Sequence, residues 1–104
     1  MSITRGSSSR ERRGFVRLKV DTAMAFQIVG QTERYEGRCK NISGAGLQME
    51  TAKKLTEGMR LDVMVAAENI DLDPFRAIAE VVRVRHLPDQ HTFNVGLAIK
   101  QIIS

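Results

Sequence analysis

The sequence predicts an all-β protein, an antiparallel barrel or sandwich built from six short strands. Apolar and polar residues alternate with a period of two in several segments, as they do along strands with one buried face. Turn-forming residues separate these segments at intervals of about ten residues, and no long segment follows the period of a helix. The 104 residues, 42% of them hydrophobic, suit a single domain with one modest core.

The first expected strand covers residues 16–29. Val16, Leu18 and Val20 alternate there with charged residues, and the end of the segment is almost continuously apolar. This alternation predicts one face in water and one face in the core. Residues 30–32, Gly-Gln-Thr, then supply a turn.

Two shorter strands are expected next, at residues 35–40 and 47–50. Gly37 interrupts the first of them and predicts a β-bulge, because a glycine within a strand often marks one. Residues 41–46, with the sequence NISGAG, have the composition of a tight loop. The sequence therefore places a glycine-rich loop between these two strands.

The second half of the chain predicts three more strands. Residues 61–65 alternate after Gly58, residues 75–85 form a long strand candidate, and residues 93–99 complete the pattern. Breaks rich in turn-forming residues separate them. The last residues, 100–104, are expected to form a short helical stub.

The positive charge is concentrated at the start of the chain. The formal net charge is +4, but residues 1–20 carry six basic residues and one acidic residue, and the remainder is close to neutral. A protein that coats nucleic acid usually spreads its basic residues along a groove or face. We therefore expect no nucleic-acid polymer as a partner. Residues 1–10 are expected to be a flexible N-terminal tail, and residues 11–104 to form the folded domain.

The sequence carries no sign of export or of membrane insertion. Cys39 is the only cysteine, which rules out an intrachain disulfide and fits a reducing compartment; we expect it to be half-buried on a strand. No apolar run approaches the roughly 20 residues of a membrane span, and the first residues lack the apolar core of a signal peptide. These features predict a cytoplasmic protein without a membrane span.

No group of residues supports catalysis or metal binding. His86 and His91 are five residues apart without further ligands nearby, and they are expected to be solvated loop histidines. Ser43 does not lie in the Gly-x-Ser-x-Gly pattern of a nucleophile elbow. We expect no catalytic residue, no metal and no cofactor, and hence no enzyme.

Two short motifs remain, and together they suit an anionic ligand. Arg13 and Arg17 form the pattern Arg-x-x-x-Arg, with Arg12 directly before it, and residues 41–46 fit Asp/Asn-x-Ser-x-x-Gly. Alone, the first could be a solvated tail and the second a hairpin loop with an Asx turn. Arginine, however, makes bidentate hydrogen bonds to phosphate and guanine and stacks on aromatic planes.

The two motifs together resemble the signature of the PilZ domain, a bacterial receptor for cyclic di-GMP. The resemblance includes the closing segment FNVGLAIKQI, residues 93–102, with its internal glycine. It implies a six-stranded antiparallel β-barrel, often followed by a helix for which this chain leaves little room. It also implies a non-enzymatic receptor in signal transduction whose ligand is cyclic di-GMP.

The resemblance assigns a role to each arginine near the ligand. Arg13 and Arg17 are expected to bind phosphates and guanine edges, with the help of Arg12. Some family members carry a stacking aromatic residue on the fifth strand. Arg83 or Arg85 stands in that neighbourhood here and is expected to stack on a base through a cation–π contact.

The resemblance also assigns roles to the loop. Asn41 and Ser43 are expected to hydrogen-bond a guanine edge and a nearby phosphate, and Gly46 to let the loop turn beneath the ligand. The family often has Asp at the first of these positions. Asn keeps a carbonyl acceptor but lacks the formal charge, which reduces both the attraction for guanine N–H groups and the repulsion of phosphate.

The expected mechanism is a switch that acts on another protein. Clustered arginines repel one another until an anionic ligand neutralises them, so we expect the N-terminal arm to order on binding and to present a new surface to a downstream partner. Two alternatives stay open. One is a ligand-free PilZ-like adaptor in pilus or flagellar control. The other is a basic β-barrel for single-stranded nucleic acid, which usually carries more aromatic residues than the 5% found here.

Overall fold

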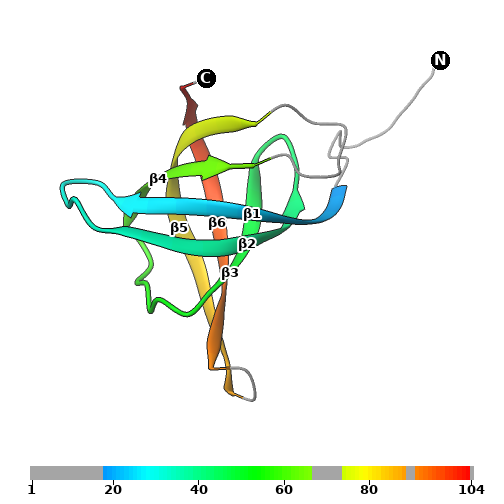
Figure 1. The fold of residues 1–104 in the computed structure, drawn as a ribbon, viewed down its shortest axis with the longest axis vertical. Coiled ribbons are helices and arrows are strands. Elements are labelled where there is room, and N and C mark those ends of the chain that lie inside the picture. Colours follow the sequence, from blue (N-terminus) through cyan, green and yellow to red (C-terminus); the bar gives the residue numbers. More distant parts are fainter. Residues whose placement is uncertain (1–17, 67–73, 89–90, 104) are drawn as a thin grey trace.

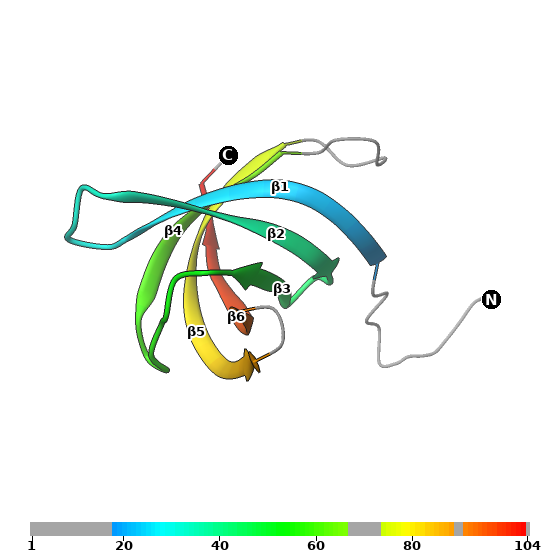
Figure 2. The same cartoon turned by 60° about the horizontal axis from the view of Figure 1, so that its bottom comes forward.

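The computed structural model of the protein describes residues 18–66, 74–88 and 91–103. They form an antiparallel sheet that closes into a barrel with the strand order β1-β2-β3-β6-β5-β4 (Figures 1 and 2). The predicted all-β, six-stranded antiparallel barrel is confirmed. The strands are β1 (Leu18–Ile28), β2 (Arg34–Ile42), β3 (Gly46–Thr51), β4 (Arg60–Val65), β5 (Phe75–Leu87) and β6 (Thr92–Ile102).

The interior is filled by the inward half of each alternating pattern. On β4, Leu61 and Val63 are fully buried, whereas Asp62 between them is only partly covered. Phe26 is the bulkiest fully buried residue, and its ring stacks on Tyr35 of β2 with 5.5 Å between the ring centroids. Because side chains fill the inside, any ligand must bind on the outer surface or at an open end of the barrel.

β5 and β6 form the longest hairpin of the sheet. Their pairing continues to the pair Leu87–Thr92, whereas β4 pairs with β5 only as far as Glu80. The far end of this hairpin projects beyond the rest of the barrel, at the bottom of Figure 1. The outer face of β5 is therefore reachable from solvent next to its pairing with β6.

The predicted bulge at Gly37 is wrong. Gly37 lies opposite Met24 in regular register, and the register of β2 shifts between Cys39 and Asn41 instead. A side chain at position 37 would collide with the Met49 side chain, 2.9 Å from the place of a Cβ atom. The glycine in this strand thus marks a close approach of β3 rather than an extra residue.

The predicted helical stub at residues 100–104 is also wrong. β6 continues through Lys100 to Ile102, with Gln101 opposite Ile78, and the Ile103 N–H donates to the Arg76 carbonyl at 2.8 Å. The backbone groups of β5 offer hydrogen bonds to these residues. The strand conformation lets the backbone N–H and C=O groups of β6 use these partners, which a helical turn would not. Ser104, the expected tail at 1–10 and the expected strand start at Val16 lie outside the described residues.

Candidate functional site

The outer surface carries one row of residues that crosses five neighbouring strands. The register pairs Lys19 with Asn41, Asn41 with Gln48, Gln48 with Gly96 and Gly96 with Arg83. Directly paired residues of antiparallel strands have Cα atoms about 4.5–5.5 Å apart, and their side chains stand on the same face. The row therefore holds basic groups at both ends, two amides between them and a gap at the glycine.

A pocket of about 240 Å³ lies over this row. Four of the residues predicted from the sequence line it, although they come from different strands and loops: Asn41, Ser43, Gly46 and Arg83. Roughly 300–1,000 Å³ is usual for the site of a drug-sized ligand. The pocket is thus large enough for only part of a drug-sized molecule.

The other predicted site residues fall elsewhere. Arg85 lies one row further along β5, opposite Asn94, and does not line the pocket. Arg12, Arg13 and Arg17 lie outside the described residues. The described chain begins at Leu18, which pairs with Ile42 at the end of β2. The sequence that contains the arginines is therefore joined to the barrel beside the pocket loop.

Asn41 is oriented by a neighbour that the sequence analysis missed. Asn41 Nδ2 donates a hydrogen bond to Gln48 Oε1 at 2.7 Å, from β2 to the directly paired position on β3. Within the described residues, Asn41 Oδ1 and Gln48 Nε2 make no hydrogen bond. The pair therefore keeps the acceptor Asn41 Oδ1 and the donor group Gln48 Nε2 available for a ligand. Gln48 was detectable only as the outward residue between the buried Leu47 and Met49.

Ser43 closes the loop on itself. Its hydroxyl donates to the Gly46 carbonyl at 3.3 Å and accepts from the Ala45 N–H at 3.3 Å. The backbone repeats the closure, because the Ser43 N–H donates to the same Gly46 carbonyl at 2.8 Å. The serine thus fixes the shape of the loop, and its second lone pair is left for a ligand.

Gly46 is required by the packing of two strands. It pairs with Ala98 of β6, and a Cβ atom at position 46 would overlap the backbone carbonyl oxygen of Leu97. A backbone group cannot move aside as a flexible side chain can. The motif glycine therefore brings the loop close against β6, on the floor of the pocket.

A bulge in β5 turns two successive side chains toward the pocket. Val81 is opposite Leu97 and Arg83 is opposite Gly96, so Val82 is the extra residue between them. Both Val82 and Arg83 are exposed, and both line the pocket. Bulges often re-aim side chains at functional sites. The alternation of apolar and polar residues cannot reveal this bulge, because it assumes that successive side chains of a strand point to opposite faces.

The basic groups at the two ends of the row have no acidic partner among the described residues. Neither Lys19 nor Arg83 forms an ion pair with any residue of the described segments. Arg83 lines the pocket, and Lys19 lies beside Asn41 at the other end of the row. A guanidinium without an acidic partner attracts anions and can bind a planar anionic group in a bidentate manner. The described part of the site thus offers a cationic group and two amides to a ligand.

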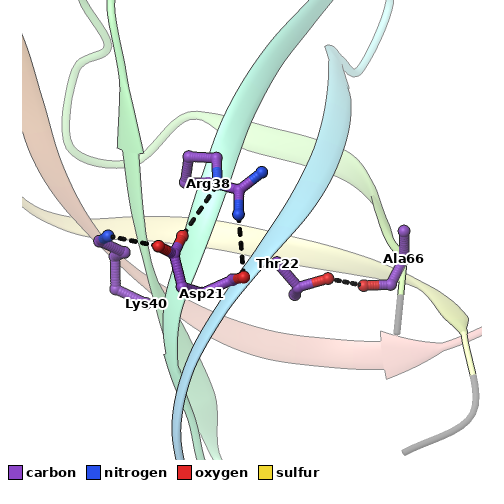
Figure 3. Close-up of polar contacts among 5 residues, drawn as sticks. All are labelled: Asp21, Thr22, Arg38, Lys40 and Ala66. Atoms are coloured by element: carbon purple, nitrogen blue, oxygen red, sulfur yellow. Dashed lines mark hydrogen bonds and ion pairs between the residues drawn. The ribbon is translucent and has the colours of Figure 1, made fainter. Parts of the chain in front are cut away.

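The register of β1 on β2 shifts between Lys19 and Thr22, which marks a bulge, and an ion-pair cluster next to the row holds this bulge against β2. Asp21 Oδ1 accepts from Arg38 Nε at 2.9 Å, and Lys40 Nζ lies 3.4 Å from Asp21 Oδ2 (Figure 3). The hydrogen bond from Arg38 holds the pKa of Asp21 below its usual value. On the same bulge, the Thr22 hydroxyl donates to the Ala66 carbonyl. These contacts fix β1 where it leads to the pocket.

Cys39 lies on the inner side of β2, behind the pocket loop. It is fully buried, not half-buried as expected, and burial raises the pKa of its thiol to about 11. Its Sγ lies 3.6 Å from the Asn41 carbonyl oxygen. The thiol is therefore protonated at neutral pH and packs as a small apolar group.

Two negative findings hold for the part of the chain that the structure describes. It contains no group of three or more His, Cys, Asp and Glu side chains arranged to hold a metal ion. It also contains no helix with the length and apolar character needed to span a membrane.

A family model described as PilZ domain matches residues 11–104. The chain belongs to the PilZ family. The resemblance noted from the two motifs is thereby confirmed. No curated protein matches the sequence significantly.

Solved structures share the fold of this PilZ domain at low sequence identity. The inhibitor of motility MotI/DgrA of Bacillus subtilis superposes with a TM-score of 0.73 at 19% identity, covering 91% of this chain. The PilZ domain of YcgR from Escherichia coli with c-di-GMP gives 0.58 at 16% identity, covering 90% of this chain and 79% of that one. The MrkH–c-di-GMP complex of K. pneumonia gives 0.62 at 16% identity and 88% coverage. The chain spans 46% of the Bacillus protein and 45% of MrkH.

Proposed function

We propose that this PilZ domain is a receptor for cyclic di-GMP that works through a protein partner and not as an enzyme. The observation that carries the proposal is the convergence of Asn41, Ser43, Gly46 and Arg83 in one pocket. This pocket lies near the first residue of β1, because Leu18 pairs with Ile42 of its lining. Arg17, Arg13 and Arg12 stand one, five and six positions before Leu18 in the sequence. Two of the structurally similar proteins are complexes with c-di-GMP, which supports the choice of ligand.

The chemistry of the ligand matches the groups that the chain offers. Cyclic di-GMP carries two phosphates and two guanines. Arginine side chains bind phosphate oxygens and the O6 and N7 atoms of guanine, and they stack on the base. The pocket supplies Arg83, Asn41 and Gln48 on the barrel side. In this proposal Arg13 and Arg17, with Arg12, bind the phosphates and guanine edges that the 240 Å³ pocket leaves uncovered.

Isothermal titration tests the proposal directly. The protein is titrated at physiological salt with cyclic di-GMP, and with GTP and linear pGpG as controls for nucleotide and charge. Saturable binding that is selective for the cyclic dinucleotide is expected. Absence of heat at high protein concentration would overturn the proposal and favour an adaptor that works through protein contacts alone.

The arginine motif is tested by single substitutions. A charge-assisted hydrogen bond contributes about 1.5–3 kcal/mol net, so Arg17→Ala or Arg13→Ala is expected to weaken cyclic di-GMP binding at least about tenfold. Arg34→Ala is the matched control, because Arg34 is exposed on β2 and does not line the pocket. Equal affinity of Arg17→Ala and the parent protein would remove Arg17 from the site.

We further propose that the arginine arm orders when the ligand binds and then contacts a downstream protein. Neutralisation of clustered guanidinium groups by two phosphates favours a compact arm over an extended one. Limited trypsin digestion is expected to cut after Arg12, Arg13 or Arg17 without ligand and much more slowly with saturating cyclic di-GMP. Cleavage at the same rate in both states would sink the arm switch while leaving the binding proposal intact.

A further inference from the structure

Gly96 leaves a gap in the row of outward side chains. The packing of the barrel does not require a glycine at this position. A Cβ atom at position 96 would meet Arg83 Cβ at 3.6 Å and Val82 Cγ2 at 3.7 Å, which are ordinary van der Waals distances. The backbone φ of Gly96 is not positive either, since positive φ values among the described glycines occur only at Gly30 and Gly58. Glycine within a strand is unfavourable when nothing demands it. Its presence in the lining of the pocket points to an occupant from outside the chain.

The two sides of the gap are chemically different. Gln48 lies directly opposite Gly96 on one side, and Arg83 lies directly opposite it on the other. The apolar side chain of Val82, 51% exposed, stands beside Arg83. A flat ring over Gly96 would therefore touch an amide along one edge and a guanidinium and an apolar group along the other.

The amide pair has the polarity of one particular base edge. With Asn41 Nδ2 donating to Gln48 Oε1, the acceptor Asn41 Oδ1 and the donor group Gln48 Nε2 are left for a ligand of the pocket that both residues line. The Watson–Crick edge of guanine presents the acceptor O6 beside the donors N1–H and N2–H₂. Gln48 Nε2 can donate to O6 while Asn41 Oδ1 accepts from N1–H or N2–H₂. Adenine presents a donor, N6–H₂, where guanine presents O6.

We propose that Gln48 selects guanine over adenine and that Gly96 is kept without a side chain to seat the base. The inference rests on the proposed function, because it names the base-selecting residues of the same site. Gln48 lies outside both motifs, and Gly96 is the internal glycine of the closing segment, to which the sequence assigned no role. Gln48 acts both by orienting Asn41 and by its own contact to the base.

The test measures the affinities for cyclic di-GMP and cyclic di-AMP side by side. Both ligands carry the same phosphates, so their ratio cancels any effect of charge on phosphate binding. Gln48→Glu keeps an acceptor for Asn41 Nδ2 but replaces the donor to O6 by a carboxylate oxygen. The preference for cyclic di-GMP is expected to fall at least about tenfold. Gln101→Glu, on β6 outside the pocket, introduces the same charge and is expected to leave the ratio unchanged.

Two further variants make the result independent of folding defects. Gln48→Met removes the donor without adding charge and is expected to lower the same ratio by about threefold or more. Gly96→Ala is expected to melt at the temperature of the parent protein or above it, yet to bind cyclic di-GMP about fivefold or more weakly because its methyl group occupies the gap.

The outcomes separate this inference from the proposed function. If the parent protein binds cyclic di-GMP and Gln48→Glu weakens both dinucleotides equally, base selection by Gln48 is overturned while the receptor function stands. If a folded Gly96→Ala variant binds cyclic di-GMP with the affinity of the parent protein, the proposal that the base lies over Gly96 is likewise overturned. If the parent protein binds neither dinucleotide, the proposed function and this inference fail together.

Discussion

Two regions of the outer surface differ in how their charged residues are paired. On β4 and β5, Arg76 donates two hydrogen bonds to Asp62, at 2.9 and 2.5 Å, and the charges cancel. On the pocket side, Lys19 and Arg83 stand at the ends of a row of amides without an acidic partner among the described residues. Charged side chains that pair with each other contribute to the stability of the fold. Charged side chains without such a partner beside a pocket can bind an anion.

Two glycines of the pocket show the same division between fold and ligand. Gly46 has no room for a side chain, because the Leu97 carbonyl occupies the place of its Cβ atom. Gly96 has that room and faces the open pocket. The packing of β3 against β6 therefore explains Gly46. It does not explain Gly96, for which we propose a role in ligand binding.

The largest expected effect separates these two glycines. Gly46→Ala is expected to lower the free energy of unfolding by about 1–3 kcal/mol, because the added methyl group forces β3 away from β6. For a domain of this size, about 1 kcal/mol shifts the melting temperature by roughly 4–8 °C. Thermal denaturation followed by circular dichroism measures the shift. A Gly46→Ala variant as stable as the parent protein would contradict the packing explanation.

The next prediction separates two arginines on the same strand. Arg83→Ala is expected to weaken cyclic di-GMP binding by about tenfold, since Arg83 lines the pocket and makes charge-assisted contacts. Arg85→Ala removes the same charge one row away, opposite Asn94, and is expected to change the affinity by less than about twofold. Titration of both variants gives the comparison. Equal losses would mean that net charge and not the pocket governs binding.

The smallest effect concerns the paired side. The hydrogen bonds from Arg76 lower the pKa of Asp62, so the native state favours the ionised carboxylate more than the unfolded chain does. The stability from this pair is present above the ordinary carboxyl pKa of 3.8 and is lost as the pH falls through the lowered value. Asp62→Asn is expected to cost less than about 1 kcal/mol at pH 7.

This pH dependence is checked by urea denaturation at pH 7 and at about pH 3. The stability difference between the parent protein and Asp62→Asn is expected to shrink toward zero at the acidic pH. The cyclic di-GMP affinity of this variant at pH 7 is expected to equal that of the parent protein. Weaker cyclic di-GMP binding by Asp62→Asn would contradict the statement that the Asp62–Arg76 pair serves stability and not ligand binding.

The fold could be predicted from the sequence because alternation reports directly on burial. Leu61 and Val63 on β4 lie inside as their spacing requires, and the strands at 35–40 and 47–50 lie within β2 and β3. The end of β6 could not be predicted, because residues 100–102 are strand only through their pairing with β5. Local sequence carries no signal for a hydrogen-bonding partner that lies far away in the chain.

The candidate site could be predicted only where a motif names it. Asn41, Ser43 and Gly46 are neighbours in the sequence, and the structure brings Arg83 to the same pocket. Gln48 and Gly96 join the row through the registers of β3 and β6. Register depends on how whole strands pair, and the β5 bulge that exposes Val82 has no local signature in this sequence.

In the proposed complex, cyclic di-GMP binds at the pocket between β3, β5 and β6 and not at the Asp62–Arg76 pair. Backbone amide chemical shifts of the isotope-labelled protein, followed during titration with the dinucleotide, test it most directly. Saturable changes are expected at Asn41, Gln48, Arg83 and Gly96, with little change at Asp62 and Arg76. Absence of changes at the four pocket residues, or changes concentrated around Asp62 and Arg76, would contradict it.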